Sequence, residues 1–229
     1  MAGRLTLIPT PIQEDLPLES RALELLQQEA LQSDVILLVE EHKVARQRWL
    51  RWGLPRESIE RFILLNEHTQ SNLAPEIIKQ IKSGKRAYLI SDCGLPAFCD
   101  PGQELVNQCH KNKIKVTSTP FPNSIALSIA LSGFPHEKFI FSGFVPVKEP
   151  SRSDWIKKEL LSKETMIWME TPYRLMKLLE DLKNCQREIF LACDLGAENE
   201  ELLRGSSNNL IKELGTNTKR EFVLIIGPR

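Results

Sequence analysis

The stretch "YLISDCGLPAFCDPGQELV", residues 88–106, decides how the rest of the chain is interpreted. Residues 88–90 form a short apolar run typical of a buried strand, and a helical pattern opens at Gln103. The connection between them is rich in turn residues, namely Asp92, Gly94, Pro96, Pro101 and Gly102. Ligands of open α/β sheets bind just beyond the carboxyl ends of the strands, where this connection would lie. The alternative is an ordinary strand-to-helix loop whose aspartate caps a local group.

The composition describes a globular chain without a strong overall charge. Its 229 residues suffice for one large domain or two of ordinary size, and 41% of them are hydrophobic. Thirty basic and thirty acidic residues cancel, so no global field attracts nucleic acid or membrane, although local patches remain open.

The cysteines and histidines give no sign of a disulfide framework or a metal site. The five cysteines contain no C-x-x-C pair, and the four histidines are scattered. No apolar stretch approaches the roughly 20 residues of a membrane helix, and the first apolar run is too short for a signal peptide. We therefore expect a cytoplasmic protein with reduced thiols, no metal and no membrane contact.

Apolar runs alternate with helical patterns along the whole chain. Strands are expected at residues 5–8, 35–39, 87–90, 114–117, 139–141, 166–169, 189–192 and 222–226. Helices are expected at residues 21–32, 42–52, 72–83, 123–131, 154–161 and 173–182. This alternation predicts an α/β fold with mainly parallel sheets.

One segment of the chain has the composition of a domain boundary. Residues 146–153 collect prolines, charges and serines and are interpreted as a hinge. We expect an N-terminal α/β domain at residues 1–120 and a C-terminal one at 121–229, with a boundary between about 120 and 150. A ligand cleft between the two domains follows as a hypothesis.

Common phosphate-binding signatures are absent. No G-x-G-x-x-G follows the first strand and no P-loop motif occurs, which disfavours a dinucleotide dehydrogenase or a nucleotide triphosphatase. The first strand instead enters "IPTPIQEDLPLES", residues 8–20, where Asp15 and Glu19 are suited to capping the next helix.

The second strand ends in "VEEHKVARQRWLRW", residues 39–52, with Glu40 and Glu41 at its carboxyl end. The basic residues that follow are either a solvated face or a phosphate-contacting patch: Lys43, Arg46, Arg48 and Arg51. Trp49 and Trp52 share a helical face and are interpreted as core residues, with base stacking as the alternative.

Two further loops carry candidate polar groups. Glu67 and His68 follow a short apolar run and form either an acid–base pair or part of a polar loop. Asn123 and Ser124 open an apolar helix, where Asn123 is an N-cap, a ligand contact or both.

Taken together, these loops resemble the tetrapyrrole methylase family of S-adenosylmethionine-dependent methyltransferases. The chain looks closest to the branch that methylates a cytidine ribose in small-subunit ribosomal RNA. In the first part of the motif series, the branch's TPIGNL corresponds to TPIQED (10–15), its EDTR to EEHK (40–43) and its HEHNE to NEHTQ (66–70). Further along the chain, SDAGTPxxxDPG corresponds to SDCGLPAFCDPG (91–102), PGPSA to PFPNS (120–124) and ESPHRL to ETPYRL (170–175). The similarity covers essentially the whole chain, and residues 91–102 are its most specific part.

The resemblance implies a cofactor site for S-adenosylmethionine, with S-adenosylhomocysteine as product and no metal. The residues implied at the cofactor are Pro9, Asp92, Gly94, Leu95, Asn123, Ser124, Met169, Glu170 and Cys193. A carboxylate at Asp92 can accept hydrogen bonds from ribose hydroxyls or from the methionine ammonium. Gly94 permits a close approach of the backbone.

The resemblance also implies a homodimer whose partner is ribosomal RNA or the small ribosomal subunit. A ribose hydroxyl acceptor must lose its proton, and the candidates for that role or for positioning the acceptor are Glu40, Glu41, Glu67 and His68.

The sequence departs from the branch at several positions. Gln13 and Phe121 stand where the branch has glycine, and Lys43 stands where it has arginine. Two other interpretations therefore stay open: a methyltransferase of the same fold acting on a small molecule, and a non-catalytic S-adenosylmethionine-binding protein. The lost glycines favour the binding protein, whereas the retained "SDCGLP" and "ETPYRL" favour the enzyme.

Overall fold

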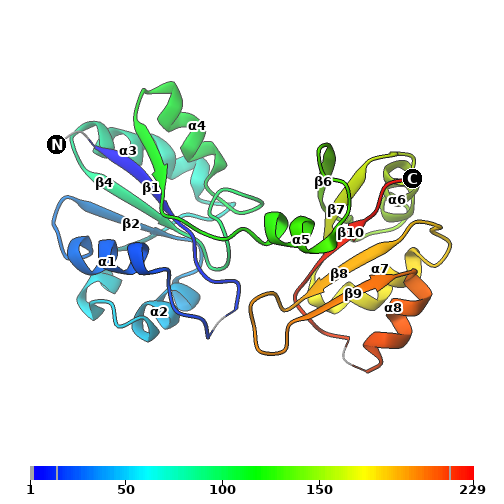
Figure 1. The fold of residues 1–229 in the computed structure, drawn as a ribbon. Coiled ribbons are helices and arrows are strands. Elements are labelled where there is room, and N and C mark those ends of the chain that lie inside the picture. Colours follow the sequence, from blue (N-terminus) through cyan, green and yellow to red (C-terminus); the bar gives the residue numbers. More distant parts are fainter. Residues whose placement is uncertain (1–2, 14, 217) are drawn as a thin grey trace. The chain divides into compact units, whose positions relative to one another are not determined.

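The chain forms two compact units, Met1–Phe121 and Pro122–Arg229, in a computed structural model that describes residues 3–13, 15–216 and 218–229 (Figure 1). Each unit contains a five-stranded sheet packed against helices. The predicted α/β fold class is confirmed.

The first unit is built on a parallel sheet of order β3-β2-β4-β1-β5. Its strands are β1 (Arg4–Ile8), β2 (Val35–Val39), β3 (Phe62–Leu64), β4 (Arg86–Ile90) and β5 (Lys115–Ser118). The carboxyl ends of parallel strands lie at one edge of a sheet, so the loops that follow β1, β2 and β4 are neighbours.

Helices cover both faces of this sheet. Side chains of α1 (Ser20–Glu29) and α2 (His42–Arg51) pack on one face, and those of α3 (Gln70–Lys82) and α4 (Gln103–Lys111) pack on the other (Figure 1). All five residues of β2 are buried, which explains why its sequence is an unbroken apolar run. A short 3-10 helix, η1 (Arg56–Arg61), precedes β3.

The sheet of the second unit is mixed. Its strands are β6 (Phe139–Phe144), β7 (Thr165–Met169), β8 (Ile189–Cys193), β9 (Glu201–Gly205) and β10 (Phe222–Ile226), in the order β6-β7-β10-β8-β9. The β6–β7 pair is parallel, whereas β10 is antiparallel to β7 and β8, and β9 is antiparallel to β8. The expectation of a mainly parallel sheet is thus wrong for this unit, because a fully buried strand has the same apolar pattern in either direction.

The helices of the second unit also lie on both faces of its sheet. One face packs against α5 (Ser124–Ser132), and the other against α6 (Ser151–Glu159), α7 (Leu175–Asp181) and α8 (Ser207–Leu214). A 3-10 turn, η2 (Pro172–Arg174), joins β7 to α7. The proline-rich segment interpreted as a hinge lies inside this unit, between β6 and α6. Within the described residues, no helix combines the length and the apolar character that crossing a membrane requires.

Leu224 tests the packing of the second unit. It is fully buried in β10, directly opposite Trp168 of β7. We expect Leu224→Ala to lower the free energy of unfolding by about 2–5 kcal/mol, because the truncation leaves a cavity. Leu202→Ala on the edge strand β9, where the side chain is 40% exposed, should cost about 0.5 kcal/mol or less. Urea unfolding followed by tryptophan fluorescence measures both, and equal effects would contradict the assigned core.

Candidate active site

Two loops of the first unit are joined at the carboxyl edge of the parallel sheet. Beyond β1 and β4, the backbone N–H of Thr10 donates to the Gly94 carbonyl at 2.9 Å, and the N–H of Gly94 donates to the Thr10 carbonyl at 3.0 Å. The hydroxyl of Thr10 is buried and donates to the Ser91 carbonyl at 3.2 Å. The first loop and the "SDCG" loop therefore form one structural element, with Pro9 buried beneath it.

Asp92 and Glu40 meet at the same edge. The backbone N–H of Glu41 donates to Oδ1 of Asp92 at 3.3 Å, and the N–H of Asp92 donates to Oε2 of Glu40 at 3.4 Å. Burial and the negative charge of Glu40 raise the pKa of Asp92 to about 6. The charge of Arg48 and the N–H of Glu41 act in the opposite sense but do not outweigh these effects, so the carboxylate is in an environment suited to binding a cation.

Asp100 belongs to the same group of carboxylates, and the sequence reasoning passed over it. Burial, together with the charges of Glu40 and Asp92, raises the pKa of Asp100 to about 7. It also lines a cavity of about 630 Å³ with Glu67, Gln70, Cys99, Pro101, Gln103, Glu104, Val106 and Asn107. The "DPG" that ends the motif at residues 91–102 was the available signal for this position.

The other candidates for acid–base chemistry differ in their surroundings. Glu67 is exposed at the cavity that Asp100 lines. Glu41 and His68 are exposed, and the backbone N–H of His68 donates to Oδ1 of Asn66 at 3.0 Å. Glu40 is the member of the predicted set whose carboxylate contacts Asp92, whereas Glu41 contacts it through its backbone N–H.

The basic residues of α2 do not form one surface patch. Arg48 is buried, and its Nη1 donates to the Pro11 carbonyl at 2.7 Å, so the prediction that it contacts phosphate is wrong. Its guanidinium instead fixes the first loop to α2. Arg51 forms an ion pair with Asp15 at 3.5 Å, while Lys43 and Arg46 are exposed.

The two tryptophans predicted for the core differ in how far they are buried. Trp49 is buried against the sheet and its Nε1 donates to the Pro55 carbonyl at 2.9 Å. Trp52 is partly buried beside the same cluster.

In the second unit, Asn123 acts as the N-cap of α5. Its Oδ1 accepts from the backbone N–H groups of Ile125 at 2.8 Å and Ala126 at 3.2 Å. Ser124 is the first residue of the helix, and Met169 ends β7; both are partly buried. The capping interpretation of Asn123 is confirmed.

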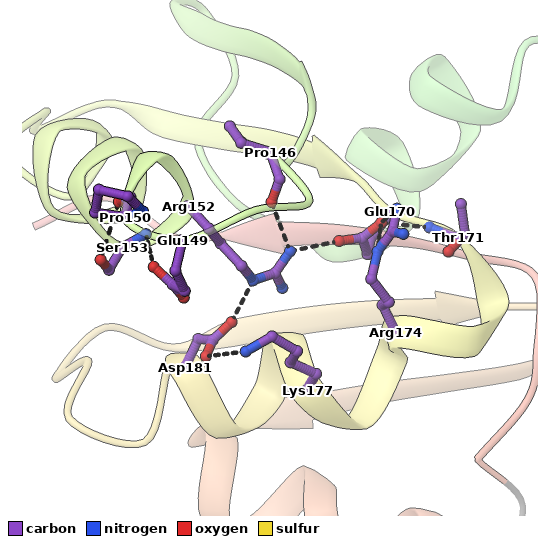
Figure 2. Close-up of polar contacts among 10 residues, drawn as sticks. All are labelled: Pro146, Glu149, Pro150, Arg152, Ser153, Glu170, Thr171, Arg174, Lys177 and Asp181. Atoms are coloured by element: carbon purple, nitrogen blue, oxygen red, sulfur yellow. Dashed lines mark hydrogen bonds and ion pairs between the residues drawn. The ribbon is translucent and has the colours of Figure 1, made fainter.

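The Glu170 carboxylate is engaged in a buried ion network (Figure 2). Its Oε2 accepts from Nη1 of Arg152 at 2.7 Å, and its Oε1 accepts from Nη2 of Arg174 at 2.6 Å. Burial acts to raise the pKa of Glu170, but the hydrogen bonds from the two arginines outweigh it and hold the pKa below its usual value. Both carboxylate oxygens of Glu170 are therefore engaged within the fold, and the placement of this strand end near the cofactor stays a prediction.

Cys193 is likewise a core residue. Its side chain is fully buried among the apolar residues between the sheet and α6, α7 and α8, and burial raises the pKa of the thiol to about 12. Its neighbour Asp194 forms an ion pair with the buried Arg220 at 2.7 Å. The thiol thus belongs to the core, and the placement of Cys193, the last residue of β8, near the cofactor stays a prediction about the end of this strand.

No group of three or more His, Cys, Asp or Glu side chains suited to a metal ion occurs in the parts of the chain that the structure describes.

Solved structures share this architecture, among them a conserved hypothetical protein from Aeropyrum pernix K1 with a TM-score of 0.68 at 12% identity, over 100% of this chain and 86% of that chain. Uroporphyrin-III-C-methyltransferase from Thermus thermophilus superposes with a TM-score of 0.55 at 15% identity, over 98% of this chain and 94% of that chain. A cobalt precorrin-4 methyltransferase of cobalamin biosynthesis gives 0.59 at 16% identity, with the same shares. At these identities the likeness concerns the fold alone, an α/β architecture that this chain shares with the two methyltransferases.

The sequence comparison is more specific. The family model "Tetrapyrrole (Corrin/Porphyrin) Methylases" matches residues 14–211, and the chain belongs to this family. Relatives named "Ribosomal RNA small subunit methyltransferase I" include one from Thermotoga maritima, 29% identical over 91% of this chain and 90% of its own length. Another, from Escherichia coli O157:H7, is 29% identical over 98% of this chain and 77% of its own length.

The raised pKa of Asp92 makes a prediction about stability. Between the ordinary carboxyl pKa of 3.8 and about 6, the folded protein keeps a proton that the unfolded chain has released, so raising the pH through this range destabilises the fold. We expect Asp92→Asn to raise the melting temperature at pH 8, with a gain that shrinks toward pH 4. Asp34→Asn is the control of opposite sign, because hydrogen bonding to Arg86 lowers the pKa of Asp34. Thermal unfolding across pH distinguishes them; a loss of stability in Asp92→Asn at pH 8 would contradict the assigned environment.

The Glu170 network makes a second prediction. Glu170→Ala leaves the fully buried Arg152 guanidinium without one of its two carboxylate partners, which should cost about 3–5 kcal/mol of unfolding free energy. Glu188→Ala removes the exposed partner of Arg204 and should cost about 1 kcal/mol or less. Denaturant titration measures both. Similar values for the two variants would show that the network is not structural.

Proposed function

We propose that this protein transfers the methyl group of S-adenosylmethionine to a ribose hydroxyl of small-subunit ribosomal RNA. Membership of the tetrapyrrole methylase family supports the cofactor, and the relatives named as small-subunit ribosomal RNA methyltransferases, which match nearly the full chain, support the acceptor.

The observation that carries the proposal is the half-buried Asp92 at the joined loops of the first unit. Its carboxylate, with those of Glu40 and Asp100, concentrates negative charge that the described ion pairs do not neutralise. A ligand that bears a positively charged ammonium and sulfonium fits such a site, because it restores the charge balance that burial disturbs. The carboxylates of Asp92, Glu40 and Asp100 are therefore suited in charge to S-adenosylmethionine.

The roles in the first unit follow from this placement. Asp92 accepts hydrogen bonds from the ribose hydroxyls or the ammonium. Gly94 has a positive φ of 77° and open space where a Cβ would stand, so a ligand can approach the Cα of Gly94, and we assign Leu95 and Pro9 to the same cofactor contact. In the second unit, we assign ligand contacts to Ser124, to Met169, and to the backbones of Asn123 and Cys193.

The sulfonium methyl is already electrophilic, so the protein mainly aligns donor and acceptor and removes one proton. We assign proton removal to Glu40 first, because it lies against Asp92, and to Glu67 second, because it shares a cavity with Asp100. General-base assistance of this kind contributes roughly 10²–10⁴-fold. Glu41 and His68, both exposed, are assigned to acceptor positioning.

Lys43 and Arg46 remain as phosphate contacts on α2. We also propose a homodimer, as the resemblance implies. Exposed apolar side chains on α5 and β6, including Leu127, Leu131 and Phe139, support it because they would be covered by a second copy.

Cofactor binding and methyl transfer test the proposal separately. Calorimetry should detect S-adenosylmethionine binding to the wild type, and Asp92→Ala should weaken it by about 1.5–3 kcal/mol, tenfold or more in Kd. Asp34→Ala, at the opposite edge of the same sheet, should leave the affinity unchanged. Absence of binding to the wild type would reject the cofactor assignment.

Transfer of a labelled methyl group to isolated small ribosomal subunits tests the acceptor in the same preparation. Binding without transfer would leave the cofactor assignment in place and remove ribosomal RNA as the substrate.

A further inference from the structure

The carboxylate of Glu170 holds both ends of the turn that follows β7. The backbone N–H of Thr171 donates to Oε1 of Glu170 at 2.8 Å, and the same oxygen accepts from Arg174, at the other end of the turn (Figure 2). Glu170 is in turn fixed by Arg152, whose Nε pairs with Asp181 of α7 at 2.6 Å. Hydrogen bonds and ion pairs therefore anchor the segment from Thr171 to Arg174 to both β7 and α7.

This rigid turn presents Tyr173 to solvent. The side chain of Tyr173 is 77% exposed, although an exposed aromatic ring is unfavourable in water. The ammonium of Lys219 lies 4.4 Å from the centroid of the ring, a distance typical of a cation–π contact. The ring thus has a cation at one face while most of its surface stays open.

Exposed apolar residues and Lys219 occur at the edge of the sheet where the turn lies. In the β6–β7 register Phe144 stands opposite Met169, so the end of β6 lies at the same edge as the turn. Phe144 is 48% exposed and Val147, just beyond it, is 58% exposed. Lys219 precedes β10, whose Val223 also pairs with Met169. The carboxylates of Glu170 and Asp181 are both engaged by Arg152, and the ammonium of Lys219 lies against the ring.

We propose that Tyr173 and Lys219 form a stacking platform for an unpaired base of the RNA substrate. The inference rests on the proposed function and adds where unpaired RNA binds. Single-stranded nucleic acid is bound by aromatic side chains that stack on bases and by cations that contact the adjacent phosphates. The fixed turn lowers the entropy that binding must offset. A cation beside an open ring matches a base and its phosphate better than it matches an apolar protein surface.

Fluorine NMR can observe this ring directly, because the chain has two tyrosines and the other, Tyr88, is fully buried. In protein labelled with fluorotyrosine, a short unpaired oligoribonucleotide should shift the Tyr173 resonance and leave that of Tyr88 unchanged. The same RNA in duplex form should shift neither. Tyr173→Phe, labelled likewise, assigns the two signals.

Affinity for the unpaired RNA gives the second measurement. Tyr173→Ala should weaken binding about tenfold, whereas Tyr173→Phe should keep it within about twofold because the stacking face remains. Lys219→Ala should flatten the salt dependence by about one unit of slope. Leu161→Ala, another exposed side chain of this unit at 70%, is the matched control and should bind as the wild type does.

A Tyr173 resonance that does not move on RNA binding overturns the platform, as does Tyr173→Ala binding equal to that of the wild type. Wild type that binds no unpaired RNA also overturns it. A Tyr173→Ala effect seen only on binding of a ribosomal protein would assign the surface to a protein partner and reject the RNA platform. In each case cofactor binding and methyl transfer by the wild type decide the proposed function independently.

Discussion

The parallel pairing of β1 with β4 is the constraint on which the candidate site depends. The register runs from Arg4↔Arg86 to Ile8↔Ile90, and beyond both strands the two loops are joined by an antiparallel bridge, the two hydrogen bonds between Thr10 and Gly94. Two loops distant in sequence are thereby fixed against each other, and Asp92 is held between them and the end of β2. Gly94 is required here for its positive φ and not for space, since a Cβ at this position would meet no atom within 4 Å.

Acidic residues at strand ends have opposite roles in the two units. In the first, Asp92 and Asp100 are partly buried beside another carboxylate, and their raised pKa values show that the fold stores unfavourable electrostatic energy there. In the second, guanidinium groups pair with Glu170 and Asp194, and these ion pairs hold turns in place. The sequence pattern at a strand end does not show whether its carboxylate is paired, because the arginines that pair with Glu170 and Asp194 come from other segments of the chain.

The central strands and most helices could be predicted because their apolar periodicity is strong. The prediction of residues 35–39 coincides with β2, and the "SDCGLP" loop lies where the strand-end rule places it. The reversed direction of β10 could not be predicted, since a strand buried on both faces carries no directional signal. The edge strand β9 was missed because "ELLRG" alternates only weakly. Arg48 was misassigned because helical spacing gives its face but not the Pro11 carbonyl that draws its guanidinium inward.

The charge distribution limits how an RNA substrate could be held. The carboxylates at the edge of the first sheet repel phosphates, and the chain as a whole has no net charge to attract them. For an enzyme of the proposed kind, phosphates must therefore contact separate cations, such as Lys43 and Arg46 on α2, while only the ribose approaches Glu40 and Asp92. A bound cationic cofactor would offset the negative charge at this edge and weaken the repulsion. Electrostatics thus favours cofactor binding before RNA binding, and the same carboxylates that hold the donor would hinder the acceptor until the donor is present.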